Sequence, residues 1–266
     1  MMIVDGREAL IGGANLCDTY MEGRLSPLWH EFEMKVSGPV AGQIQRRYDV
    51  SWNWMATIDR AAVRGRPAAR GDLALAALTR LQRPQFTIYP ELTPVDTRAS
   101  GSAMVQFQYQ QSYMDRGHAG RFRLLFSELV KRARRKVVMY IPYINPPEEF
   151  ERALVDTARR GVEVILITNS EATNDEAAAA AVAKPYLPRL IRAGVQIREY
   201  QTRTLHGKAM MIDDSVVSIG SHNFTRQSFG WNGEANLMTG DPQVVAKFRA
   251  MVERDLDEAP LLNNIR

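Results

Sequence analysis

The chain has 266 residues, of which 45% are hydrophobic and 24% are charged, and its formal net charge is +4. These proportions are ordinary for a globular protein, and the length suffices for one large domain or two fused halves. The single cysteine, Cys17, excludes a disulfide framework and a cysteine-based zinc site. The mild basic excess suits an anionic substrate, but it does not distinguish lipid head groups from nucleic acid. The sequence contains no apolar run long enough to span a membrane and no signal-peptide pattern.

The hydrophobic pattern predicts strands that alternate with helices. In chain order, the predicted elements are strands at 9–12 and 32–36, a helix at 39–54, a strand at 104–109, a helix at 122–135, a strand at 137–141, a helix at 148–160, a strand at 162–168, an interrupted helix at 174–193 and a strand at 195–200. The alternation after residue 101 predicts parallel strands with helices on both faces of the sheet.

Residues 60–100 carry several arginines between glycines and prolines. This composition predicts a basic loop that connects two regions of the chain. We expect a solvated loop; contact with anionic lipid or with nucleic acid is the alternative.

Polar side chains that suit a phosphate gather in the last quarter of the chain. His206 and Lys208 alternate, so both side chains lie on one face of an extended strand. The imidazole can share a proton or attack with a ring nitrogen, and the lysine can hold an anion. Further polar residues follow at short intervals: Asp213, Ser221, Asn223, Asn232 and Glu234. Together they predict a phosphate pocket in which serine and asparagine add neutral donors.

The spacing His-x-Lys-x-x-x-x-Asp from His206 to Asp213 resembles the motif of the phospholipase D superfamily. Gly-Ser-x-Asn at 220–223 and Asn-x-Glu at 232–234 follow in the same register. A His-x-Lys pair alone arises by chance in many chains, and a core histidine beside a surface lysine is the alternative interpretation. The additional motifs make the resemblance specific.

The resemblance implies double-displacement chemistry without a metal or cofactor. In the family, one histidine attacks phosphorus and forms a phosphohistidine, while a second protonates the leaving oxygen and later activates the incoming alcohol or water. His206 would be the second histidine, and Lys208 would neutralise phosphate oxygens. Glu234 would fix the tautomer of His206. Asp213 completes the motif, and we expect it to support the strand pair and Lys208.

The N-terminus repeats the C-terminal motif. A shift of 208 positions places Asp5 on Asp213, Gly12 on Gly220 and Asn15 on Asn223 without a gap. The shift extends the prediction of phosphate binding to Gly13 and Asn15 and gives Asp5 a supporting role. At this shift the partners of His206 and Lys208 would precede Met1, so the expectation is a chain that lacks the first His-x-Lys and has impaired activity.

The stretch from Trp29 to Asn53 resembles the segment after the first motif in bacterial cardiolipin synthases. Glu31 stands where that family usually carries an aspartate. Its repeat position parallels that of Glu234, so Glu31 is expected to orient the histidine of the first motif. The alternative is a carboxylate at the rim of the site, on an exposed face of a strand. Asn232 is expected to support Glu234.

The implied fold is α/β, with two halves related by a pseudo-twofold axis, mixed and largely parallel sheets, and the active site in the seam. The N-terminal half is expected to be incomplete. The expected organisation is a remnant of the first repeat at 1–59, the connecting basic region at 60–100 and the second repeat at 101–266.

The implied function is a phosphodiesterase or phosphatidyltransferase that acts on a phospholipid such as phosphatidylglycerol. A nuclease-like diesterase acting on DNA or RNA and a non-catalytic fragment that binds phosphate esters are the alternatives. The resemblance further implies peripheral membrane contact and a bacterial location at the inner membrane or in the cytoplasm. The pattern gives no oligomeric state.

Overall fold

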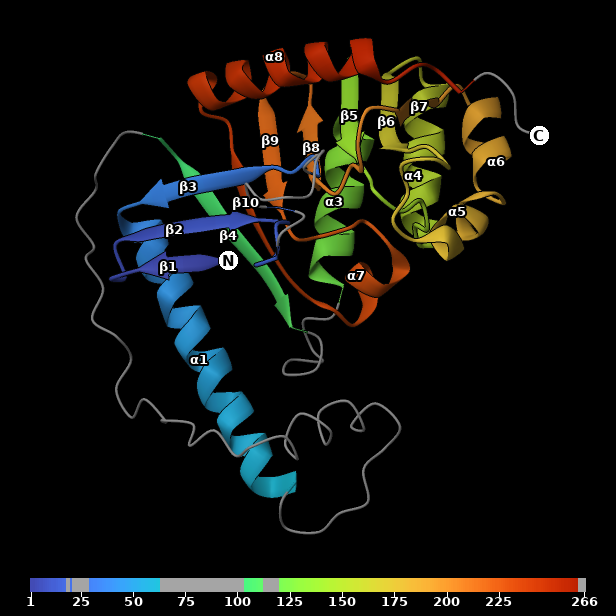
Figure 1. Cartoon of the computed structure of the whole chain (residues 1–266). Helices are drawn as coiled ribbons and strands as arrows, with labels where there is room; N and C mark the ends of the chain where they lie inside the picture. The colour runs from blue at the N-terminus through green and yellow to red at the C-terminus, as the bar shows by residue number, and fades with distance from the viewer. Residues whose placement is uncertain (18–19, 21–28, 63–102, 112–119, 263–266) are drawn as a thin grey trace. The chain divides into compact units, whose positions relative to one another are not determined.

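The computed structural model describes residues 1–17, 20, 29–62, 103–111 and 120–262 (Figure 1). The chain divides into two compact units. The larger unit comprises Met1–Met2, Leu10–Lys35 and Ser102–Arg266, and the smaller comprises Ile3–Ala9 and Val36–Gly101. The predicted basic loop at 60–100 lies outside the described residues from position 63 onward.

A seven-stranded mixed sheet forms the centre of the larger unit. Its strand order is β4 (Val105–Gln111), β10 (Gly233–Thr239), β9 (Val216–Gly220), β8 (Ala209–Ile212), β5 (Lys136–Tyr140), β6 (Glu163–Asn169) and β7 (Gln196–Tyr200). Among the described strands of this sheet, only β5 with β6 and β6 with β7 pair in parallel. The mixed α/β class is therefore confirmed, whereas the expectation of a largely parallel sheet is wrong. The connection from β8 to β9 is a tight turn, which permits antiparallel pairing alone.

Helices cover both faces of this sheet. They are α3 (Arg121–Arg132), α4 (Glu148–Arg159), α5 (Ala177–Ala183), α6 (Leu187–Arg192), α7 (Arg226–Gly230) and α8 (Pro242–Glu258). Val137 and Met139 point into a buried cluster with Phe126 of α3 and Leu154 of α4. Tyr140 points to the opposite face, because successive strand side chains alternate. There its ring meets Phe248 of α8, with the ring centroids 5.9 Å apart.

Local sequence explains where these helices begin and end. Asp241 caps α8, since its carboxylate accepts the backbone N–H groups of Gln243 and Val244. Gly161 and Gly194 follow α4 and α6 with φ of 86° and 94°, the left-handed conformation that ends a helix without strain in glycine. The helix predicted at 174–193 divides into α5 and α6, in keeping with Pro185 between them and Pro188 in the first turn of α6.

The N-terminal elements repeat the order of the C-terminal ones. Strands β1 (Met2–Val4), β2 (Glu8–Gly12) and β3 (Glu33–Ser37) form a sheet in the order β1-β2-β3, and α1 (Pro39–Ala62) follows. Asp5 in the first turn has φ of 53° and Asp213 in the β8–β9 turn has φ of 52°. Strand β2 lies 208 positions before β9, so the structure reproduces the repeat found in the sequence.

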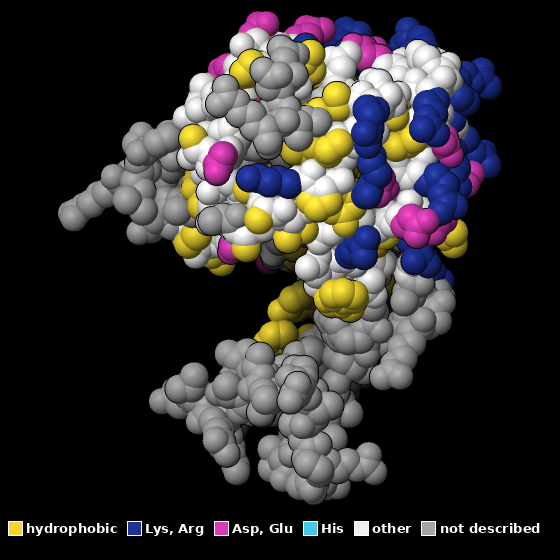
Figure 2. Space-filling view, turned by 90° about the vertical axis from the view of Figure 1, so that its right-hand side faces the viewer, with side chains coloured by type: hydrophobic (Ala, Val, Ile, Leu, Met, Phe, Trp, Pro, Cys, Tyr) yellow, Lys and Arg dark blue, Asp and Glu magenta, His cyan; other side chains and the backbone are white. Residues whose placement is uncertain are grey.

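The surface near α5 and α6 is mixed in character. Figure 2 shows hydrophobic side chains in the middle of this face, with lysine, arginine, aspartate and glutamate side chains around them. Within the described part of the chain, no helix has the length and apolarity that crossing a bilayer requires.

His222 belongs to the core. Its ring packs against Phe229 and Phe122 at centroid distances of 4.4 and 4.9 Å. Its Nδ1 accepts the backbone N–H of Phe224 at 3.0 Å. Complete burial lowers the pKa of His222 to about 3. The neutral imidazole therefore serves packing.

Acid should destabilise the protein through His222. Between the folded pKa of about 3 and the ordinary value of 6.5, the unfolded chain binds a proton that the folded chain does not. The free energy of unfolding should thus fall by about 1.4 kcal/mol per pH unit as the pH drops below that ordinary value. Urea unfolding of the wild type and of His222→Phe at neutral and acidic pH measures this difference. Identical pH dependence in the two proteins would contradict it.

Candidate active site

The backbone of His206 is fixed from two sides. The carbonyl of His30 accepts the N–H groups of His206 and Gly207 at 2.9 and 2.8 Å, and the N–H of His30 donates to Thr204 at 2.8 Å. From the other side, the side chain of Asn169 binds both the N–H and the carbonyl of Leu205, at 2.7 and 2.8 Å. These contacts bring the segment after Trp29 alongside the segment that carries His206.

Gly207 allows this close approach. A Cβ at this position would lie 2.3 Å from a ring carbon of Phe32. Any larger residue would therefore push the two segments apart and separate His206 from Glu31, which precedes Phe32.

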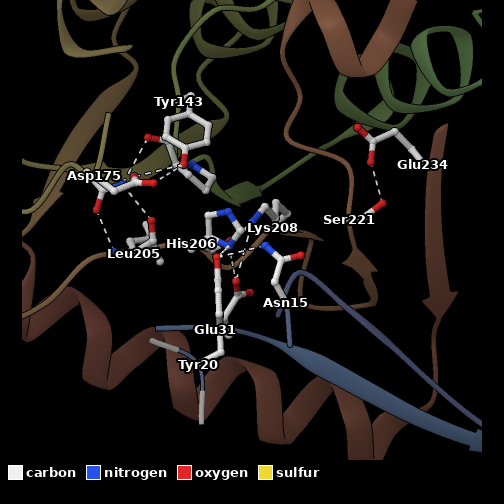
Figure 3. Close-up of polar contacts among 12 residues, drawn as sticks. Asn15, Tyr20, Glu31, Tyr143, Asp175, Leu205, His206, Lys208, Ser221 and Glu234 are labelled. Atoms are coloured by element: carbon white, nitrogen blue, oxygen red, sulfur yellow. Dashed lines mark hydrogen bonds and ion pairs between the residues drawn. The ribbon is translucent and has the colours of Figure 1, made fainter. Parts of the chain in front are cut away.

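Three side chains converge on Nδ1 of His206 (Figure 3). Glu31 forms a short hydrogen bond with it, Lys208 Nζ lies 2.5 Å away, and the hydroxyl of Tyr20 lies 3.1 Å away. Glu31 can only accept a hydrogen bond, whereas Lys208 also donates to the carbonyl of His206. We therefore assign the ring proton to Nδ1, donated to Glu31. Nε2 keeps its lone pair and has no partner among the described residues.

Lys208 is almost completely buried, with 2% of its surface exposed. Its amine lies 3.7 Å from Glu31. Burial lowers the pKa of Lys208 to about 8, although the negative charges of Glu31 and Glu234 act in the opposite direction. A desolvated amine that is still charged at neutral pH is suited to hold a phosphate group beside His206.

Aromatic rings surround the imidazole. The ring centroids of Tyr20, Trp29 and Tyr143 lie 5.3, 5.4 and 6.3 Å from that of His206. Burial raises the pKa of Tyr20 to about 12, so its hydroxyl stays protonated. Burial and the nearby carboxylate of Asp175 raise the pKa of Tyr143, whose hydroxyl donates to both oxygens of Asp175 at 3.0 Å. The rings exclude water from one side of the histidine.

The structure contradicts the prediction that Glu234 orients His206. Its carboxylate accepts the hydroxyl of Ser221 at 2.6 Å, and Asn232 lies 3.5 Å from its second oxygen. Figure 3 shows this pair apart from the imidazole. Glu31 occupies the position on His206 that was predicted for Glu234. Burial raises the pKa of Glu234, against the hydrogen bond from Ser221.

Asp213 lies outside the site. It follows β8, whereas His206 precedes that strand, and the four residues of β8 alone span about 13 Å at the usual rise per strand residue. Its carboxylate accepts the backbone N–H groups of Arg134, Arg135 and Lys136 at 2.8 to 3.0 Å. Burial alone would raise the pKa of Asp213, but these N–H groups outweigh it and lower the pKa. Asp213 thus fixes the β8–β9 turn to the connection between α3 and β5.

Replacing Asp213 with alanine should therefore affect stability and leave the site unchanged. The variant loses three hydrogen bonds to a charged group and places alanine at a positive φ, so the free energy of unfolding should fall by about 2–4 kcal/mol. Denaturant unfolding measures this loss, and phosphodiester binding by the folded fraction should equal that of the wild type. A specific loss of binding in the folded protein would restore Asp213 to the site.

The remaining predicted residues are placed as follows. Gly13 lies against the site, since a Cβ there would be 2.6 Å from Glu31 Oε2 and 3.0 Å from Lys208 Nζ. Asn15 donates to the hydroxyl of Tyr20 at 3.4 Å. Asn223 makes no hydrogen bond to His206 or Lys208; its Oδ1 is buried without a partner in the described residues. The role of each in binding phosphate is a proposal.

Several residues at the site were not predicted from the sequence. Tyr20, Tyr143 and Asp175 carry no motif, and only the fold brings them to His206. His30 is another such residue: its Nε2 lies 2.9 Å from Asp255, whose carboxylate also accepts the hydroxyl of Tyr140 at 2.6 Å. This buried network anchors the segment that presents Glu31.

Within the described ranges, no three histidine, cysteine, aspartate or glutamate side chains come together as a metal site requires. Lys208 beside His206 would also repel a cation. The chemistry of this donor set therefore suits an anion.

Comparison with known proteins agrees with this geometry. Residues 126–256 match the family model described as "Cardiolipin synthase, PLD-like domain". Cardiolipin synthase 1 of Staphylococcus epidermidis is 26% identical over 263 residues, and cardiolipin synthase A of Pseudomonas putida is 30% identical over 261 residues. These alignments cover 98% and 97% of this chain and 47% of each relative, so the chain spans about half the length of the curated relatives it matches.

Two solved structures share the fold. Phosphatidylserine synthase of Haemophilus influenzae superposes with a TM-score of 0.67 and 16% identity, covering 98% of this chain and 62% of that one. Nuc, a phospholipase D family member from Salmonella typhimurium, gives a TM-score of 0.50 and 21% identity, covering 61% of this chain and all of that one. The fold is thus of the phospholipase D type. In sequence, the chain is similar to cardiolipin synthases over almost its whole length.

Proposed function

We propose that this chain supplies a phosphatidyl-transfer site that acts on a phospholipid such as phosphatidylglycerol. The observation that carries the proposal is His206, held through Nδ1 by Glu31 beside the buried amine of Lys208. The similarity to cardiolipin synthases over almost the whole chain supports the choice of a phospholipid.

Each residue of the site has a separate role in this proposal. Lys208 holds the non-bridging phosphate oxygens and stabilises the charge that grows on them during transfer. Glu31 keeps the proton on Nδ1 and stabilises the imidazolium that forms when Nε2 takes a proton. By resemblance, Nε2 of His206 protonates the leaving oxygen and later takes the proton of the incoming alcohol or water. A second histidine, which the single His-x-Lys pair of this chain does not supply, would attack phosphorus as the bond to the leaving oxygen breaks and would carry the phosphatidyl group between the two steps. Tyr20 and Trp29 shield the pair from water.

A phospholipid substrate lies in a bilayer, so the protein has to reach a membrane surface. We propose a peripheral contact. Co-sedimentation with vesicles that contain anionic lipid measures this contact, and the bound fraction should fall as salt rises.

The proposal is tested with the purified full-length protein and vesicles that contain phosphatidylglycerol. We expect cardiolipin and free glycerol to form in equal amounts, at the low rate that a single His-x-Lys pair allows, and His206→Asn to abolish both products. Glu33→Gln provides a control, because Glu33 is an exposed carboxylate two residues from Glu31.

DNA is assayed in parallel. Cleavage of DNA that weakens steeply with salt, without any lipid product, would favour the nuclease alternative. Saturable binding of a soluble phosphodiester without turnover of lipid or DNA would indicate a site that binds phosphate esters only.

A further inference from the structure

A second feature of the larger unit is a pocket next to His206. It lies beyond the ends of β5, β6 and β7, has a cavity volume of about 100 Å³ and is partly open to solvent. Ligands of α/β proteins bind preferentially at the carboxyl ends of parallel strands. The three strands that pair in parallel here are those that form the pocket.

The pocket shares two walls with the site of His206. Tyr143 lines it, and the ring of Tyr143 also faces the imidazole. Asn169 lines it as well, and its amide holds the backbone of Leu205 immediately before His206. A group bound in the pocket would therefore contact two residues that also contact His206 or the segment that carries it.

Two glutamates belong to the polar part of the lining. The carboxylates of Glu171 and Glu199 have no hydrogen-bond or ion-pair partner in the described part of the chain. Burial and the charge of Glu171 raise the pKa of Glu199, so the two groups are close enough to interact. Two unpaired carboxylates repel a second phosphate and accept hydrogen bonds from hydroxyl groups.

The other walls favour a neutral ligand with some apolar surface. Ala180 and Ala183 of α5 and Leu187 of α6 form an apolar side. Lys184 also lines the pocket and has no ion pair among the described residues, so it would repel an ammonium group. A short polyhydric alcohol offers hydroxyl groups to the carboxylates and C–H groups to the alanines.

We propose that this pocket binds the polyol head group of the phosphodiester, glycerol in the case of phosphatidylglycerol. The inference rests on the proposed function and adds where the alcohol part of the substrate sits. The pocket would thereby determine which alcohol is placed next to Nε2 of His206.

The test fills the pocket without touching the residues that contact His206. Ala180→Phe places a ring in the pocket, and Ala178→Phe makes the same change at an exposed position of the same helix. Initial rates are measured with phosphatidylglycerol and with bis(p-nitrophenyl) phosphate, which has no polyol. We expect Ala180→Phe to raise the KM for phosphatidylglycerol about tenfold or more and to leave both kinetic constants for the aromatic diester within about twofold. Ala178→Phe should resemble the wild type in both assays.

An equal loss on both substrates, or no loss on phosphatidylglycerol, would overturn the pocket assignment. Failure of the unmodified protein to turn over either diester would count against the proposed function. In that case calorimetric titration with glycerophosphoglycerol still tests the pocket assignment. Binding to the unmodified protein that is tenfold weaker in Ala180→Phe supports the assignment. No binding to the unmodified protein, or equal binding to both proteins, overturns it. Preferential binding of glycerophosphoethanolamine, lost in Glu199→Gln, would show an amine site and also overturn it.

Discussion

Replacing Glu31 with glutamine should lower kcat for phosphatidyl transfer by about 10³- to 10⁴-fold, the range known for loss of the carboxylate that orients a catalytic histidine. Glutamine has the same shape and removes the negative charge that stabilises the imidazolium. Its amide can donate to Nδ1 of His206, which would place the ring proton on Nε2 and remove the lone pair from the substrate side. The loss should appear in kcat, with KM changed little.

The matched control is Glu33→Gln, which makes the same change at an exposed position of β3. Its kinetic constants should equal those of the wild type. Thermal unfolding of both variants separates a chemical effect from a loss of folded protein. If Glu31→Gln retained a kcat within threefold of the wild type while folded, Glu31 would be a structural carboxylate and the assignment of its role would fall.

The sequence predicted the central pair of this site but not its partners. His206 and Lys208 are two residues apart, so strand geometry alone brings them together. The same repeat that identified Glu31 suggested that it serves the histidine of its own half, and that Glu234 serves His206. The structure has Glu31 on His206, because the backbone of His30 pairs with residues 204–207. Such a pairing joins segments about 175 positions apart, and local periodicity carries no information about it.

The fold shows the same contrast: local sequence predicted individual strands, but it did not predict pairings and contacts between distant segments. The apolar pattern of the sequence predicted β5, β6 and β7 close to their observed bounds. The motif residues that begin at His206 were recognised for their chemistry, not as strands. Strands β8 and β9 lie among them and add an antiparallel pair that the strand-and-helix alternation did not predict. Tyr143 and Asp175 lie in loops after β5 and β6, where spacing predicts neither the conformation nor the contact between them.

Lys208→Met should abolish anion binding and make the protein more stable. At neutral pH the amine is charged, yet burial holds its pKa at about 8, below the ordinary value of 10.5. The folded state therefore bears a cost of up to about 3 kcal/mol for this charge relative to the unfolded chain. Methionine has a similar length and no charge, so the free energy of unfolding at neutral pH should rise by about 1–3 kcal/mol.

The same pKa predicts how binding depends on pH. Bis(p-nitrophenyl) phosphate keeps one negative charge over the whole range, so only the protein titrates. Its affinity for the wild type should fall as the pH rises through about 8, because Lys208 loses its proton there. In Lys208→Met the affinity should be at least a hundredfold lower and independent of pH over this range. Lys247→Met, at an exposed position of α8, should change neither quantity.

The two measurements on Lys208 separate a functional role from a structural one. A lysine kept for stability would leave a destabilised protein when replaced, because Glu31 would lose a buried partner. A lysine kept for phosphate binding costs stability in the free protein and recovers it when an anion is bound. We therefore expect the diester to raise the melting temperature of the wild type and to leave that of Lys208→Met unchanged. A less stable Lys208→Met protein that still binds the diester would show that the amine serves the fold rather than the substrate.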